Sequence, residues 1–64
     1  MKPGDLIRIT RRMFVPPLEL TVLVTRVIAV PAFGEGIEFI HEGAVKSLLP
    51  AEGLDFVEVI REGG

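Results

Sequence analysis

Alternation of apolar and polar side chains is the clearest signal near the start of the chain. In residues 6–10, Ile7 and Ile9 share one face of an extended segment, and their polar neighbours share the other. A period of two residues is typical of a β-strand that buries one face. The Lys-Pro-Gly-Asp at residues 2–5 contains two residues that do not belong in a strand interior. We therefore expect a turn there, followed directly by a first strand.

A longer alternating segment covers residues 19–30. Its apolar face consists of Leu18, Leu20, Val22 and Val24. The segment is rich in valine, threonine and isoleucine, which favour strands. Arg26 falls on the apolar face if alternation is strict, so we expect a β-bulge near Thr25 and Arg26 that bends a long strand. Residues 11–17 lie between these two strands and contain two consecutive prolines, which predicts a long first loop.

Turn residues divide the second half of the chain into short strands. The strands expected there are residues 37–40, 44–48 and 54–60. Glycine and proline mark a second loop at residues 31–36, a tight hairpin at residues 41–43 with Gly43 at positive φ, and a one-turn connector at residues 50–53. Residues 61–64 are expected to fray. The alternative of a helix over residues 44–54 is weakened by Pro50 and Gly53.

These five strands make one domain over residues 1–64, and their loop order is that of a small barrel. Lys2–Ile9 resembles the opening of SH3-like domains, in which a Gly-Asp pair precedes a strand of apolar and basic residues. Val22–Ile28 resembles their bent second strand, and Val57–Ile60 resembles their closing strand. The pattern is similar in particular to the very short SH3-like proteins of tailed bacteriophages and environmental viral sequence.

The resemblance implies an all-β fold, namely a five-stranded SH3-like barrel with a long first loop and a one-turn connector before the last strand. It implies less about function, because many of the short phage proteins have no assigned activity. Signalling SH3 domains grip proline-rich peptides with clusters of aromatic side chains. This chain has no Trp and no Tyr, so that activity is not expected.

The composition limits how such a domain is stabilised. Of the 64 residues none is Cys and one is His, so neither a disulfide nor a thiolate metal site is available. A chain of this length buries only about 60% of its unfolded surface, which makes its stability marginal. With 48% hydrophobic residues the chain is not expected to be disordered. Packing, self-association or both must therefore hold the fold together.

Charge is distributed unevenly along the chain, although the net charge is only −2. Residues 1–30 carry five basic and two acidic side chains, whereas residues 31–64 carry two basic and seven acidic ones. Either the two halves neutralise each other across a compact fold, or the basic end faces an acidic partner.

We expect neither a membrane span nor a secretory signal. The longest apolar-rich run, residues 20–32, is too short to cross a bilayer and is interrupted by Arg26 and Pro31. Lys2 is followed by Pro, Gly and Asp rather than by the apolar stretch of a signal peptide. The expected location is the cytoplasm, or the interior of a viral host cell.

Few residues could support catalysis or metal binding. His41 is the one candidate general base, and Ser47, the single serine, does not lie next to it in sequence. We interpret Glu35, Glu38 and Glu42 as solvated positions, because a cation site needs a tight loop of oxygen ligands. We therefore expect no enzyme activity, no metal and no cofactor.

The first loop carries the most informative departure from the pattern. Its apolar residues must either fold over the end of the barrel or contact another chain, and both options stay open for Phe14. The interaction surface predicted by the second option consists of Met13, Phe14, Val15 and Phe33, with Arg11 and Arg12 at its rim. The expected partner is a protein, which includes a second copy of this chain.

Nucleic-acid binding is the alternative function. Phosphates could be contacted by Arg8, Arg11, Arg12, Arg26 and Lys46. Against this stands the sequence pI of about 5.2, since nucleic-acid-binding domains typically have a pI above about 9.

Overall fold

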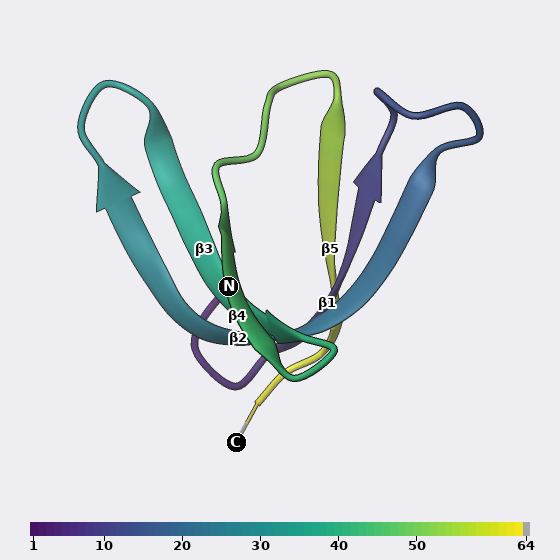
Figure 1. Cartoon of the computed structure of the whole chain (residues 1–64). Coiled ribbons are helices and arrows are strands. Elements are labelled where there is room, and N and C mark those ends of the chain that lie inside the picture. Colours follow the sequence, from purple (N-terminus) through teal and green to yellow (C-terminus); the bar gives the residue numbers. More distant parts are fainter. Residues whose placement is uncertain (64) are drawn as a thin grey trace.

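All strands of the protein belong to one antiparallel β-sheet. The computed structural model describes residues 1–63, and within that range it contains five strands and no helix. The strands are β1 (Leu6–Arg11), β2 (Leu18–Val30), β3 (Gly34–His41), β4 (Ala44–Leu48) and β5 (Asp55–Arg61). Their order in the sheet is β4-β3-β2-β1-β5 (Figure 1). The predicted all-β fold with five strands is confirmed, and the alternative of a helix over residues 44–54 is wrong.

The long strand β2 bends the sheet into two arms. Residues 18–23 of β2 pair with β1, and residues 23–30 pair with β3. Val24 is opposite Phe39 and Arg26 is opposite Glu38, so Thr25 is an extra residue in the ladder. The predicted bulge near Thr25 and Arg26 is thus confirmed, and a bulge bends the strand that carries it. The first arm contains β1, β5 and the start of β2, and the second arm contains β3, β4 and the end of β2 (Figure 1).

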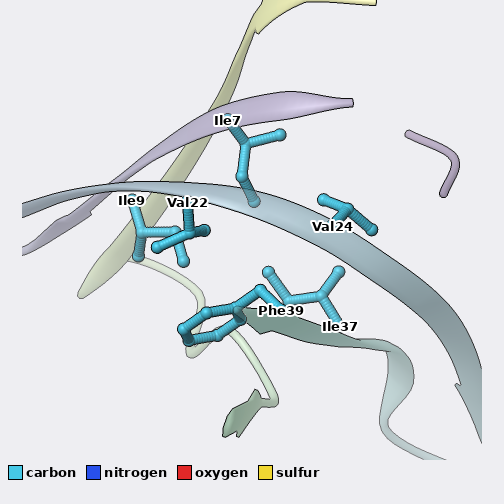
Figure 2. Close-up of a cluster of buried hydrophobic side chains, with 6 residues drawn as sticks. All are labelled: Ile7, Ile9, Val22, Val24, Ile37 and Phe39. Carbon is cyan, nitrogen blue, oxygen red and sulfur yellow. The ribbon is translucent and has the colours of Figure 1, made fainter. Parts of the chain in front are cut away.

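The two arms bury the sides that face each other. The core consists of Ile7, Ile9, Val22, Val24, Ile37 and Phe39, each at most 4% exposed. Figure 2 shows the side chains of β1 and β2 pointing toward the two from β3. Burying one such side chain contributes about 1.5–3 kcal/mol, so this concave face is the main source of stability. The buried faces predicted for the first two strands are confirmed at Ile7, Ile9, Val22 and Val24, whereas Leu20 is half-buried and Leu18 is 41% exposed.

The sheet is open and does not close into a barrel. β4 and β5 form its two edges, and within residues 1–63 they do not pair with each other. The prediction of a barrel is therefore wrong, because the sheet does not close. β4 has only five residues, and Pro50 just beyond it has no backbone N–H with which to extend the ladder. The chain reaches β5 through a single turn, in which Leu54 and Asp55 both donate to the Ala51 carbonyl at 3.0 and 2.9 Å. This turn confirms the predicted one-turn connector.

The limits of several elements differ from the prediction. β3 begins at Gly34 rather than at residue 37, because Gly34 and Gly36 pair with the end of β2. The second loop therefore shrinks to a turn at residues 31–33. The tight hairpin between β3 and β4 is confirmed, with φ of 52° at Glu42 and 76° at Gly43.

Both ends of the described chain meet at Asp5, which is 2% exposed. Its Oδ1 accepts hydrogen bonds from the Gly63 backbone N–H at 2.9 Å and from the Lys2 ammonium at 3.1 Å. The Asp5 N–H donates to the Lys2 carbonyl at 3.2 Å, which confirms the turn at residues 2–5. The prediction of fraying is wrong for residues 61–63, since Arg61 ends β5 and Gly63 is hydrogen-bonded. Gly64 lies outside the described residues.

Candidate interaction surfaces

The first loop, residues 12–17, leaves β1 beside a buried ion pair. The Nε of Arg11 lies 3.0 Å from Oδ1 of Asp55, whose side chain is 1% exposed. Oδ2 of Asp55 accepts the backbone N–H of Ala51 at 2.9 Å. The hydrogen bond from Ala51, followed by the hydrogen bond and charge of Arg11, lowers the pKa of Asp55 against the opposing effect of burial. Removing one partner of a buried pair leaves a charge uncompensated, so this contact fixes the start of the loop against the connector before β5.

Arg12 makes two further contacts at the same end of the loop. Its N–H donates to the Leu54 carbonyl at 2.7 Å, and its guanidinium carbon lies 4.4 Å from the centroid of the Phe56 ring. A cation–π contact at an exposed site stabilises by about 0.5–1 kcal/mol. Phe56 is opposite Thr10 on the convex face, away from the core. The prediction missed Phe56, although alternation in the last strand places it on the polar face with Glu58.

Exposed apolar side chains lie on this loop and on the segment to which Arg12 attaches it. Met13 is 52% exposed, Phe14 45% and Val15 98%. Of the two options for Phe14, the structure therefore shows the exposed one, with the Arg11 guanidinium carbon 5.9 Å from its ring centroid. Leu54 and Phe56 are also exposed and lie beside Arg12. We call Met13, Phe14, Val15, Leu54 and Phe56 the first-loop patch.

Phe33 lies at the opposite end of β2 from the first-loop patch. It is 73% exposed in the turn between β2 and β3. The first loop precedes β2, this turn follows it, and β2 is 13 residues long. Figure 1 shows the two at the tips of different arms. Of the predicted surface, the structure brings together Arg11, Arg12, Met13, Phe14 and Val15, and it separates Phe33 from them.

A pocket lies between the ends of β2 and β4 and the start of β3 in the second arm, beside the turn that carries Phe33. Its volume is about 170 Å³, and it is lined by Ile28 and Val30 of β2, Gly36 and Ile37 of β3, Ser47 and Leu48 of β4, and Leu49 just after that strand. A Cβ atom at Gly36 would lie 3.5 Å from the Leu48 carbonyl oxygen and 3.6 Å from Cγ2 of Val30. The missing side chain at Gly36 therefore helps to keep this space open. The pocket depends on the register of Gly36 opposite Ile28, which periodicity alone does not reveal.

The five basic residues considered for nucleic-acid binding do not gather on one surface. Arg11 and Arg26 each lie beside a carboxylate, with N–O distances of 3.0 and 3.9 Å. Arg8 is opposite a glutamate in the ladder between β1 and β5. Lys46 lies on the edge strand β4, at the opposite side of the sheet from β5. Arg12 is stacked on the ring of Phe56. Phosphate contacts along a strand of nucleic acid need a more continuous basic surface than this.

The residues considered for catalysis or cation binding also lie apart. His41 is opposite Ala44 next to the β3–β4 hairpin, whereas Ser47 is opposite Glu38. Nδ1 of His41 is buried and has no hydrogen-bond partner within residues 1–63. Glu38 accepts a hydrogen bond from the Thr25 hydroxyl at 3.0 Å. In the described part of the chain, no group of three or more His, Cys, Asp or Glu side chains could hold a metal ion.

Comparison with known proteins identifies no relative. The chain matches no protein-family model, no curated protein and no solved structure. Within residues 1–63 there is also no helix of the length and apolar character needed to span a membrane.

Proposed function

We propose that this protein is a non-enzymatic protein-interaction or assembly module with an SH3-like arrangement of strands, related to the very short SH3-like proteins of tailed bacteriophages. The order of its connections supports the proposal: a long first loop, a short turn, a two-residue hairpin and a one-turn connector. The antiparallel pairing of the first strand with the last supports it too. A small domain of this kind acts through loops that its sheet positions.

The first-loop patch is the observation that carries this proposal. Apolar area left in water costs about 25 cal/mol per Å² relative to burial, and contiguous apolar patches commonly mark interaction sites. The loop is already held by the Arg11–Asp55 ion pair and by Arg12 on Phe56. A surface that is ordered before binding loses less conformational entropy when a partner arrives. The patch is therefore suited to protein binding.

The rim of the patch indicates what kind of protein would bind there. Arg11 and Arg12 supply its charge, and arginines beside aromatic rings are frequent where interface energy is concentrated. Arg12 is exposed and stacks on Phe56, and among residues 1–63 it forms no ion pair with a carboxylate. We infer a partner that presents apolar side chains flanked by acidic groups. Nucleic acid is less supported, because the basic residues are dispersed.

Selection from a random-peptide display library tests this proposal without a known partner. Wild-type protein is the bait, and Phe14→Ser is used for counter-selection. We expect the enriched peptides to be apolar and acidic, and to bind Phe14→Ser at least about tenfold more weakly than wild type. Phe33→Ser is the matched control, because it removes an exposed loop phenylalanine outside the patch, and it should bind these peptides as wild type does.

Two results would overturn the first-loop proposal: a selection that enriches no peptide, or peptides that bind Phe14→Ser as tightly as wild type. A mixed-sequence single-stranded oligonucleotide provides the second arm. If it binds, and if its affinity falls steeply between about 50 and 200 mM salt, the nucleic-acid alternative is favoured instead.

A further inference from the structure

The turn between β2 and β3 holds an aromatic ring in solvent. The N–H of Phe33 donates to the Val30 carbonyl at 3.0 Å, and Ala32 adopts a φ of 70°. The Phe33 residue is 73% exposed. A phenylalanine has few rotatable bonds, and here its backbone is hydrogen-bonded before any contact is made. It would therefore lose little conformational freedom when buried by a partner, while contributing a large apolar surface.

The pocket beside this turn has a volume and lining suited to a phenyl ring. Its volume is about 170 Å³, with Ile28, Val30 and Leu49 among its lining residues. In another protein, an engineered apolar cavity of about 150 Å³ binds benzene. Phe33 of the same chain is exposed rather than buried in this pocket. The surface thus presents an aromatic side chain and, beside it, an apolar pocket of matching size.

The aromatic side chain and the pocket lie together as a two-fold dimer requires. In such an interface both copies present the same patch, so the inserted residue and the pocket that receives its counterpart belong to one surface, and they lie close together when both are near the two-fold axis. Val30 provides this proximity, because it lines the pocket and also accepts the Phe33 hydrogen bond. A foreign ligand for the pocket would not require an exposed aromatic residue next to it. The pairing of the two features favours a second copy as the occupant.

The convex face on the second arm is apolar and balanced in charge. Leu23, Ile40 and Val45 are cross-strand neighbours that are 43%, 42% and 65% exposed. Among the described residues, the charged side chains on this face are Arg26 and Glu38, which are opposite each other in the ladder. Two copies can pack these faces without an excess of like charge, and the arginine of one can pair with the glutamate of the other.

We propose that two copies of this chain form a two-fold symmetric dimer, in which Phe33 of each copy fills the pocket of Ile28, Val30, Gly36 and Leu49 in the other. The inference rests on the proposed assembly function and deepens it by naming the second copy as a partner. It uses the second arm, so the first-loop patch on the other arm stays free for a different protein.

Light scattering on a size-exclusion column tests the dimer over about a hundredfold range of concentration. Wild type should approach twice the chain mass of 7.0 kDa at high concentration and fall toward a single chain on dilution. Phe33→Ser and Gly36→Val should each raise the dissociation constant at least about tenfold, because the first removes the ring and the second fills the pocket. Phe14→Ser is the control and should dimerise as wild type does. Far-UV circular dichroism checks that each variant keeps the β-sheet.

Three outcomes would overturn the proposed dimer. The first is a wild type that has the mass of one chain at all concentrations. The second is dimerisation that neither Phe33→Ser nor Gly36→Val weakens. The third is a dimer that Phe14→Ser alone dissociates, which would move the contact to the first-loop patch. If peptide selection fails while Phe33→Ser still dissociates the dimer, the first-loop proposal fails and the dimer stands.

Isotope-filtered nuclear Overhauser spectra of a mixed labelled and unlabelled sample supply a direct readout of the contact. We expect cross-peaks between the ring protons of Phe33 in one copy and the methyl groups of Ile28 and Val30 in the other. A dimeric sample without these cross-peaks would exclude the proposed insertion.

Discussion

Asp5 joins two segments that are far apart in the sequence. Its carboxylate binds the backbone N–H and the ammonium of Lys2, and it also binds the N–H of Gly63, 58 residues away. These bonds, with that from Gly63 the largest contribution, lower the pKa of Asp5 from 3.8 to about 2, although burial opposes the shift. A Cβ atom at Gly63 would overlap the backbone of Gly4. This close approach of the two ends therefore depends on glycine at position 63.

The low pKa of Asp5 predicts that the fold is sensitive to acid. Its pKa is about 2 in the folded chain against an ordinary value of 3.8, so the ionised form stabilises the fold fully above about pH 4. This contribution is lost as the pH falls toward about 2. The pKa of Asp55 is also lowered, and its contribution has the same sign. Urea titrations should therefore show a free energy of unfolding that falls steadily between about pH 4 and pH 2.

Two variants separate Asp5 from the other acids in this experiment. Asp5→Asn should be less stable than wild type at neutral pH and should lose less stability on acidification. Glu52→Gln changes an exposed acid in the connector and should follow the wild-type profile. If acidification lowers the free energy of unfolding of Asp5→Asn as much as that of wild type, the role assigned to this carboxylate is contradicted.

The bulge in β2 decides which face of the second arm is buried. Val24 and Val27 both face the core, although they are three residues apart. This is possible because Thr25 adds one residue to the strand, and a shift of one residue moves every following side chain to the other face. Arg26 is thereby placed on the convex face, where it lies 3.9 Å from Glu38. Without the extra residue a charged side chain would point into the core.

Phe39 and Phe56 form a matched pair for testing which face of the sheet is the core. Phe39 is 4% exposed and Phe56 is 45% exposed. Phe39→Ala should cost about 3–5 kcal/mol, a large share of the roughly 3–10 kcal/mol available to a domain of this size. Phe56→Ala should cost about 1 kcal/mol or less, mainly through the lost contact with Arg12. Thermal unfolding followed by circular dichroism measures both, and equal losses would contradict the assigned core.

The open sheet leaves a large share of the apolar surface uncovered in a single copy of the molecule. Within residues 1–63, fourteen large apolar side chains are at least 41% exposed, against six hydrophobic residues in the core. A short chain has too little interior to bury more of them. The two surfaces proposed for binding lie at opposite ends of β2, on different arms (Figure 1). A dimer formed through the second arms would carry two first-loop patches and could bind two partners at once.

Dimerisation predicts that thermal stability depends on concentration. Association with a second folded copy stabilises the folded state by mass action, so the Tm of wild type should rise over about a hundredfold increase in concentration. The Tm of Phe33→Ser should change much less, whereas that of Phe14→Ser should rise in parallel with wild type. Differential scanning fluorimetry measures all three, and a constant Tm for wild type would contradict the prediction.

Much of the fold could be predicted from short-range patterns. Alternation placed Ile7 and Ile9 in the core, and the turn residues on either side of β4 gave its observed limits of Ala44–Leu48. The misplaced charge of Arg26 located the bulge, and Gly43 located the hairpin. These features depend on a residue and its near neighbours, because the strand period, the steric freedom of glycine and the ring of proline all act locally.

The features on which function depends needed contacts between distant segments. Phe14 is exposed because Arg11 and Arg12 attach its loop to Asp55, Leu54 and Phe56. The pocket exists because the register of β2 against β3 sets Gly36 opposite Ile28. The length and bend of β2 separate Phe33 from the first loop, and the sheet is open because β4 and β5 do not pair within residues 1–63. Each of these features depends on which strands pair and in what register. The spacing of residues along one strand encodes neither the pairing nor the register.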